Sequence, residues 1–274
     1  MELVVAADAS EPSRVAIRTA LRWGARAGAR TTILSVGEPR ATPALAAIGG
    51  AEAAFGRSLV SEGIDRWLQS ELDREPTWAA PACAAAVGVP SIEIARFAEE
   101  AKADLLVLGR KERSAATRLL VGDTADAVAR RSTVPFLFVP GPLGVPERLL
   151  VALDGTERGY RVYPAARRIA DAIGAALDVV TVEPARGDEP PELAASVPSA
   201  RSLSLAESLG GDGAALRIRR GAAVREILAE IDATGARTLV VGYRRGGPPG
   251  VLEAGSVARQ LAHRAPCAVL GIPL

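Results

Sequence analysis

The sequence predicts an α/β protein made of two tandem, doubly wound open sheets of about five parallel strands each, packed together as an internal pseudo-dimer. Three observations predict it: a length of 274 residues, short apolar runs that alternate with helical patterns, and a repeat that covers nearly the whole chain. At about 100–200 residues per domain, this length suits two domains. An apolar content of 49% against 24% charged residues is enough for a substantial core and excludes a disordered chain.

The repeat begins with the first strand of each half. Residues 3–7 form an apolar run followed by Asp8, and residues 149–153 form a second run followed by Asp154. Short, nearly continuous apolar runs are typical of parallel strands that are buried on both faces. Each half therefore begins with a buried strand that has a carboxylate at its end.

A pair of glycines marks the later part of each copy. A strand ends at Gly109, and Gly122 follows thirteen residues later. The same spacing separates Gly242 from Gly255 in the second copy. The offset between the copies is 146 residues at the start and 133 at the end, so we expect the second copy to lack about 13 residues of its second helix.

Helical patterns connect the strands, as parallel strands require. The first predicted helix has an apolar face made of Val15, Ala16, Thr19, Ala20 and Trp23. The second has an apolar face made of Val60, Ile64, Trp67, Leu68 and Leu72. Each copy ends in an apolar strand, at residues 134–139 and 267–272.

A linker rich in proline and glycine, residues 140–146, separates the copies. It divides the chain into a first domain at residues 1–140 and a second at residues 147–274. Residues 37–56 and 183–202 are rich in proline, glycine and alanine, and we assign no structure to them. An apolar last strand is a liability at a sheet edge, and pairing the two last strands would cover both. This is the basis of the predicted pseudo-dimer, and a homodimer of whole chains stays open.

Charge and hydropathy exclude several kinds of partner. The 33 basic and 32 acidic residues balance, and they also balance within each half, so we expect no nucleic-acid binding. No apolar run approaches the length of about 18 residues that a membrane span needs, and no basic segment precedes the first strand as in a secretory signal. With two distant cysteines in the sequence, we expect a cytoplasmic protein.

The sequence offers no catalytic or metal constellation. His263 is the only histidine, and it lies late in a predicted helix, where a cation favours the helix dipole. One histidine and two distant cysteines do not make a zinc site, and the phosphate-binding loop of P-loop enzymes is absent. We interpret Cys83 and Cys267 as small buried apolar residues. We therefore expect neither an enzyme nor a bound metal.

The strand that ends at an aspartate and the paired glycines resemble the universal stress protein family, in its tandem two-domain form. Nucleotide-binding members carry glycine, two residues, glycine, nine residues, glycine, and then serine or threonine. The chemistry of this pattern is clear, because glycine lets the backbone approach phosphates and a helix N-terminus favours an anion. Such ligands bind at the carboxyl ends of the strands.

The first copy departs from this pattern at two positions. Glu112 stands at the middle glycine and Asp123 replaces the hydroxyl residue, although Gly109 and Gly122 are present. Each carboxylate would repel a phosphate, at about 4 kcal/mol for unit charges 4 Å apart at an effective dielectric of about 20. We expect a weak or empty site here. The resemblance assigns to it Asp8, Val36, Gly109 and Gly122.

The second copy keeps more of the pattern. Gly242, Gly255 and Ser256 are present, whereas Arg245 stands at the middle glycine, where it either fills the phosphate space or binds a phosphate oxygen. The resemblance assigns to this site Asp154, Val182, Gly242, Arg245, Gly255, Ser256 and Val257. Helix capping is the alternative role for Asp8 and Asp154, because each precedes a predicted helix.

These patterns favour a non-catalytic stress-response module that binds ATP or a related adenine nucleotide, mainly in the second domain. The alternative is a protein-association scaffold of the same fold that has lost nucleotide binding, which Glu112, Asp123 and Arg245 would explain. A slow nucleotide hydrolase is a third class. It lacks a visible general base or a pair of metal-binding carboxylates in the loop.

Overall fold

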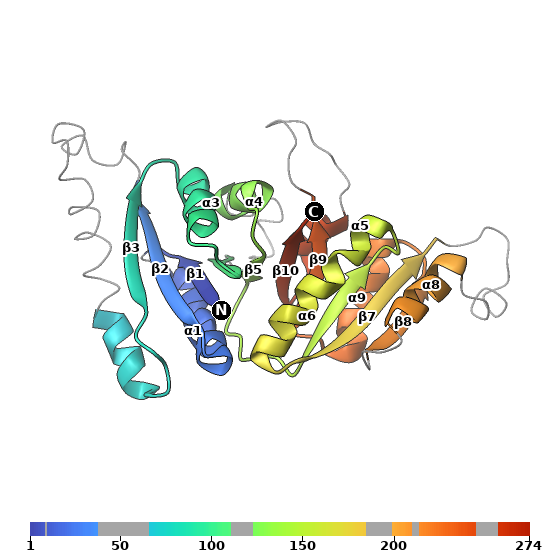
Figure 1. The fold of residues 1–274 in the computed structure, drawn as a ribbon, viewed down its shortest axis with the longest axis horizontal. Coiled ribbons are helices and arrows are strands. Elements are labelled where there is room, and N and C mark those ends of the chain that lie inside the picture. The colour runs from blue at the N-terminus through green and yellow to red at the C-terminus, as the bar shows by residue number, and fades with distance from the viewer. Residues whose placement is uncertain (9, 38–65, 111–122, 185–198, 210–213, 245–256) are drawn as a thin grey trace. The chain divides into compact units, whose positions relative to one another are not determined.

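The computed structural model describes residues 1–8, 10–37, 66–110, 123–184, 199–209, 214–244 and 257–274. It confirms the predicted α/β class (Figure 1). The chain divides into two compact units, which we call unit 1 (Met1–Val145) and unit 2 (Pro146–Ile272 with Leu274). Among the described residues, the structure contains no helix with the length and apolar content of a membrane span.

Unit 1 is an open parallel sheet with the strand order β3-β2-β1-β4-β5. Along the chain its elements are β1 (Glu2–Ala6), α1 (Glu11–Ala27), β2 (Arg30–Gly37), a helical stretch at residues 66–74, β3 (Ala82–Val87), α3 (Pro90–Glu100), β4 (Leu105–Gly109), α4 (Asp123–Arg131) and β5 (Phe136–Val139).

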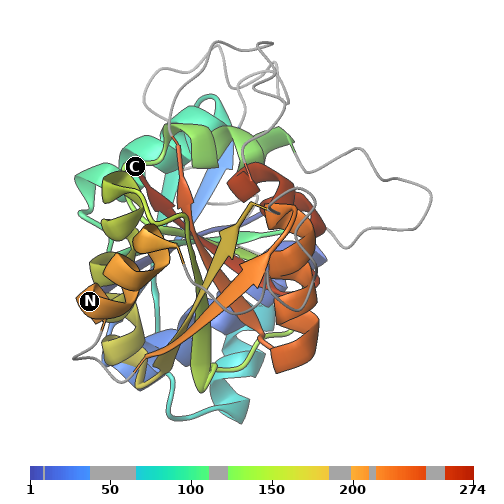
Figure 2. The same ribbon diagram turned by 90° about the vertical axis from the view of Figure 1, so that its right-hand side faces the viewer.

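Unit 2 repeats this topology with the strand order β8-β7-β6-β9-β10. Its elements are β6 (Arg148–Leu153), α5 (Glu157–Tyr160), α6 (Val162–Ile173), β7 (Ala176–Glu183), α8 (Ala200–Leu209), β8 (Ala215–Arg220), α9 (Ala223–Thr234), β9 (Thr238–Tyr243), α10 (Val257–Arg264) and β10 (Ala268–Pro273). Figure 2 shows α6 and α8 on one face of its sheet and α9 and α10 on the other. The sheet is thus doubly wound, as predicted.

The first strand of each unit lies at the centre of its sheet. In unit 1, Val4 is in register with Thr32 on one side and Leu106 on the other. In unit 2, Val151 is flanked by Val179 and Val240. Val4 and Val151 are both fully buried, because the sheet has neighbours in its plane and helices over its faces. The chain winds away from this strand in both directions, which leaves a crevice where the order reverses.

Helix α1 forms where its sequence pattern predicts it. Ser10 caps its N-terminus by accepting a hydrogen bond from the Ser13 backbone, and Pro12 lies in the first turn, where no helical N–H bond is lost. The helix ends at Gly28, whose φ of 58° is left-handed. The predicted apolar face is buried, as shown by Val15, Ala16, Thr19, Ala20 and Trp23.

The structure corrects one prediction and leaves others untested. Cys83 is exposed rather than buried, because β3 is an edge strand, whereas Cys267 is buried as predicted. Val60 and Ile64 lie outside the described residues. Residues 38–81 connect β2 to β3 and residues 184–214 connect β7 to β8, so unit 2 is shorter in this connection. The internal pseudo-dimer stays a prediction, since each unit is described by itself.

A buried carboxylate holds the start of α8 against the end of β7. Glu183, 7% exposed, accepts hydrogen bonds from the Ser199 backbone at 2.8 Å and from Ser202 Oγ at 2.6 Å. Arg220 Nε lies 3.1 Å from its other oxygen. Burial raises the pKa of Glu183, but these hydrogen bonds outweigh burial and lower the pKa to about 2. The ionised carboxylate therefore stabilises unit 2.

We predict that Glu183→Gln lowers the free energy of unfolding at pH 7 by about 1–3 kcal/mol, because charge-assisted bonds are lost. Since the folded-state pKa is lowered, the contribution of Glu183 is complete above its ordinary value of 4.5 and is lost as pH falls towards 2. The difference between wild type and variant should therefore shrink across this range. Urea unfolding at pH 7 and pH 3 measures it, with Glu157→Gln on the exposed start of α5 as the control. A difference that stays constant with pH would contradict the assigned role.

Candidate functional site

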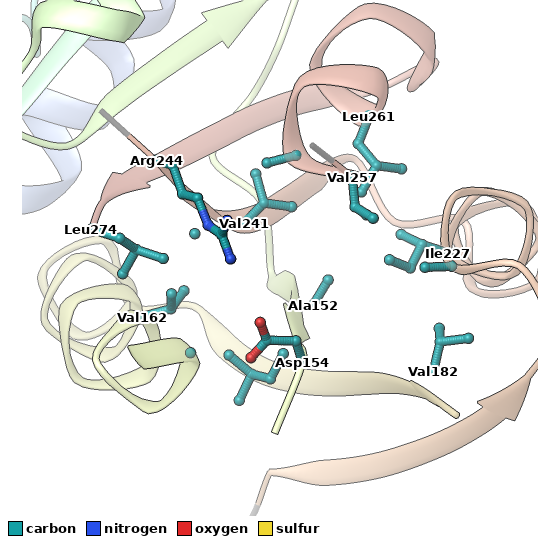
Figure 3. A pocket seen from close by; sticks show the side chains of 15 residues that line it. Ala152, Asp154, Val162, Val182, Ile227, Val241, Arg244, Val257, Leu261 and Leu274 are labelled. Atoms are coloured by element: carbon teal, nitrogen blue, oxygen red, sulfur yellow. The ribbon is translucent and has the colours of Figure 1, made fainter. Parts of the chain in front are cut away.

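Unit 2 contains a pocket of about 540 Å³ at the carboxyl ends of its strands (Figure 3). It lies where β6 and β9 run side by side, which is the point where the strand order reverses. Open α/β sheets bind ligands at this place, and pockets for small molecules usually measure about 300–1,000 Å³. The lining residues are Ala152, Leu153, Asp154, Gly159, Val162, Val182, Ala223, Ile227, Val241, Gly242, Arg244, Val257, Ala258, Leu261 and Leu274.

Two helices, α9 and α10, begin at the wall of this pocket, and α6, which continues from α5 through the helical residue Arg161, also reaches it. Val162, Ala223 and Val257 are the first residues of α6, α9 and α10, and all three line it. The N-terminal turn of a helix carries free N–H groups and a partial positive charge. The surroundings of the pocket therefore favour a ligand with negative charge.

Two charged side chains line the otherwise uncharged pocket, Asp154 and Arg244. Asp154 follows β6, and its Oδ1 accepts hydrogen bonds from Thr156 N at 2.9 Å and from Thr156 Oγ1 at 2.7 Å. Arg244 follows β9, and Figure 3 shows its guanidinium group pointing into the pocket from the side opposite Asp154. The remaining walls are aliphatic side chains and backbone.

The structure brings four of the sequence-predicted residues of the second copy together. Asp154, Val182, Gly242 and Val257 all line the pocket, although they come from β6, β7, β9 and α10. The other three, Arg245, Gly255 and Ser256, lie outside the described residues.

Sequence patterns did not assign Arg244, Ile227 and Leu274 to the site. Arg244 lies inside the glycine pattern, between Gly242 and the position of Arg245, and this place in the pattern was the one available signal. Ile227 lies one turn into α9 and looked like an ordinary core residue. Leu274 reaches the pocket because its backbone N–H bonds to the Tyr243 carbonyl at 3.0 Å, which no sequence pattern reveals.

The corresponding aspartate in unit 1 is engaged by the start of α1. Asp8 Oδ1 accepts hydrogen bonds from Ser13 Oγ at 2.6 Å and from Ser10 N at 2.9 Å. Asp8 N donates to Ser13 Oγ in return. Burial raises the pKa of Asp8, but the hydrogen bonds from Ser10 and Ser13 outweigh burial and hold the pKa below its ordinary value. Asp8 thus supports the cap of α1, the alternative role that its sequence position suggested.

The strand-end glycines differ in what lies against them. A Cβ on Gly109 would lie 2.3 Å from the carbonyl oxygen of Pro12, so the backbone of α1 covers this glycine. A Cβ on Gly242 would instead meet side chains, with Leu274 Cδ1 at 2.6 Å and Val162 Cγ2 at 2.8 Å. The first contact is rigid and the second consists of side-chain ends.

The remaining predicted residues of the first copy are only partly described. Val36 lies in β2 in register with Ala86 of β3, and Asp123 is the first residue of α4. Gly122 and Glu112 lie outside the described residues. Within the described ranges, no group of three or more His, Cys, Asp or Glu side chains is arranged to hold a metal ion.

Comparisons with known proteins all find members of one family. The family described as the universal stress protein family matches residues 1–140 and again residues 146–273. A universal stress protein of Methanocaldococcus jannaschii is 42% identical over 55 residues, which is 20% of this chain and 32% of that protein. The chain therefore matches about a third of the length of this curated relative.

Two solved structures resemble the chain over almost its whole length. A universal stress protein from Archaeoglobus fulgidus has a TM-score of 0.71 at 20% identity, with 99% of this chain and 98% of that chain covered. A putative universal stress protein from Pseudomonas aeruginosa has a TM-score of 0.68 at 16% identity, with 99% and 92% covered. At these identities the likeness shows the fold.

We predict that Gly109→Ala destabilises the protein by more than about 3 kcal/mol and Gly242→Ala by only about 1 kcal/mol. In Gly109→Ala the new methyl group meets the backbone of α1, whereas in Gly242→Ala it meets the side-chain ends of Leu274 and Val162, of which Leu274 is only partly buried. Urea unfolding of both variants measures the difference. Adding Leu274→Ala to Gly242→Ala should recover part of the loss, and equal losses in the two glycine variants would contradict this account.

Proposed function

The chain belongs to the universal stress protein family in both of its halves, and we propose that it is a non-catalytic stress-response module whose second unit binds ATP or a related adenine nucleotide. The observation that carries this proposal is the pocket at the switch point of unit 2. It gathers Asp154, Val182 and Gly242, which the sequence motif assigns to nucleotide binding, around one cavity.

The two ends of the pocket suit the two ends of a nucleotide. Figure 3 shows Val182 and Ile227 at one end, where an apolar wall suits a flat base. Arg244 lies at the other end, and α10 begins at the pocket wall with Val257. Between the ends, Asp154 offers a carboxylate that accepts hydrogen bonds from a ribose hydroxyl or from an amino group. A nucleotide would therefore place its phosphate towards Arg244.

Binding acts, in this proposal, through conformation rather than through chemistry. A ligand in this pocket contacts the ends of β6, β7 and β9 and would stabilise the conformation of unit 2 that binds it more tightly. A ligand shifts a population only through its different affinities for two states, so a partner that binds one of these states would distinguish loaded from empty protein. The carboxylate in the pocket, Asp154, has its Oδ1 held by Thr156, which suits positioning better than proton transfer.

In unit 1, the contacts at Gly109 and Asp8 favour the alternative function, a protein-association scaffold without nucleotide binding. Pro12 covers Gly109, and Ser13 engages the carboxylate of Asp8. The carbonyl group of Pro12 fills the space on one side of Gly109, and one oxygen of the Asp8 carboxylate already accepts hydrogen bonds from the start of α1. We propose that unit 1 keeps the fold for association and leaves nucleotide binding to unit 2.

A matched pair of variants tests where the nucleotide binds. Val257 and Thr124 occupy the same place in the two copies, in the first turns of α10 and α4. Both side chains are exposed, so a glutamate at either position is compatible with folding. Val257→Glu places a carboxylate at the pocket of unit 2, and Thr124→Glu places one at the same position of unit 1.

We predict that Val257→Glu weakens ATP binding by at least about tenfold, because the new charge repels phosphate, and that Thr124→Glu leaves it unchanged. Equilibrium dialysis of the full chain with labelled ATP measures both. Equal binding by the two variants would reject the site in unit 2. If millimolar ATP changes neither dialysis nor the melting temperature of the wild type, the scaffold function applies to the whole chain.

A further inference from the structure

The two charged side chains in the pocket of unit 2, Asp154 and Arg244, can each bind a different group of one ligand. Asp154 and Arg244 point into the cavity from the ends of β6 and β9, their charged groups face each other in Figure 3, and the other lining side chains are aliphatic. A ligand that satisfies both must have a hydrogen-bond donor at one point and an anion at another. With an uncharged ligand, the guanidinium group of Arg244 would have only water to bind and no anion.

Arg244 stands apart from the other arginines near the ends of the unit 2 strands. Arg219 and Arg220, on β8, are paired with carboxylates: Arg219 Nη1 lies 2.8 Å from Glu230, and Arg220 Nε lies 3.1 Å from Glu183. Within the described part of the chain, Arg244 forms no ion pair with a carboxylate. A guanidinium group in a pocket without a protein partner is free to bind an anion from a ligand.

The position of Arg244 in the chain limits which anion it reaches. It is the first residue after β9, so its Cα is fixed by the end of a strand that pairs with the central strand β6. Its side chain enters the same cavity that Asp154 and Val182 line. Its reach is therefore limited to the part of a ligand that lies inside this cavity.

We propose that Arg244 is the specificity-determining residue of this pocket and that it binds the phosphate next to the ribose. This inference rests on the proposed nucleotide binding in unit 2 and adds the class of ligand. A nucleoside monophosphate is sufficient to occupy the pocket, longer nucleotides use the same first phosphate, and the free nucleoside is discriminated against. The planar fork of arginine binds two phosphate oxygens at once, which lysine does not reproduce.

The test measures the affinities of adenosine, AMP and ATP for the full chain by isothermal titration calorimetry. The proteins are wild type, Arg244→Ala, Arg244→Lys and Arg168→Ala. Arg168 lies on the exposed side of α6 and does not line the pocket, so its removal controls for the loss of one positive charge from unit 2. Arg244 is itself exposed, and equal unfolding midpoints for all four proteins would show that folding is unaffected.

We expect the wild type and Arg168→Ala to bind AMP at least about tenfold more tightly than adenosine. Arg244→Ala should lose this advantage while its affinity for adenosine stays the same, and Arg244→Lys should keep part of it. ATP should lose affinity in Arg244→Ala by a factor similar to that for AMP.

Two results would overturn the inference, and each has a different meaning. If adenosine and AMP lose affinity equally in Arg244→Ala, or if the preference for AMP survives, then Arg244 does not read the phosphate, although the pocket still binds nucleotides. If the wild type binds none of the three ligands, the proposed function fails and this inference fails with it.

Discussion

Everything in each unit depends on one strand that has a partner on both sides. β1 pairs with β2 and β4, and β6 pairs with β7 and β9, so every backbone group of the central strand can be satisfied inside the sheet. This pairing requires helices on both faces to bury the apolar side chains, since the strand has no polar face. It also sends the chain outwards in both directions and leaves the crevice between the ends of β1 and β4, and of β6 and β9.

The two copies diverge just after that strand. In unit 1 the helix begins at Glu11, three residues after Asp8, and its first turn covers Gly109 with backbone. In unit 2 a helix also begins three residues after the aspartate, at Glu157 of α5, but it is interrupted at Arg161, and the longer helix α6 begins at Val162. The contact at Gly109 is with helix backbone, whereas the contacts at Gly242 are with the ends of two side chains, Leu274 and Val162. The residues that pack against the strand-end glycine therefore differ between two units of the same topology.

The two charged residues of the unit 2 pocket are also brought together by the strand order of the sheet. Asp154 and Arg244 are 90 residues apart in the sequence, yet each is the first residue after a strand, and the two strands are neighbours in the sheet. Parallel strands bring their carboxyl ends to one edge, so residues just after them gather without any need for a loop to fold over. The first residues of α9 and α10 line the same pocket, and α9 begins only three residues after the end of β8. A pocket that favours an anion is thus a product of the topology.

The sequence by itself determined the repeat, the α/β class and the buried face of α1, and it placed the strand ends to within two residues at Asp8, Gly109, Asp154 and Gly242, because periodicity and spacing are local properties. It also indicated which copy keeps the better nucleotide motif. Only the tertiary structure decided that Cys83 is exposed, that Pro12 lies on Gly109, and that Leu274 and Arg244 line the pocket. The physical reason is that these properties depend on which strand lies at an edge and on contacts between segments distant in sequence, and neither leaves a pattern along the chain.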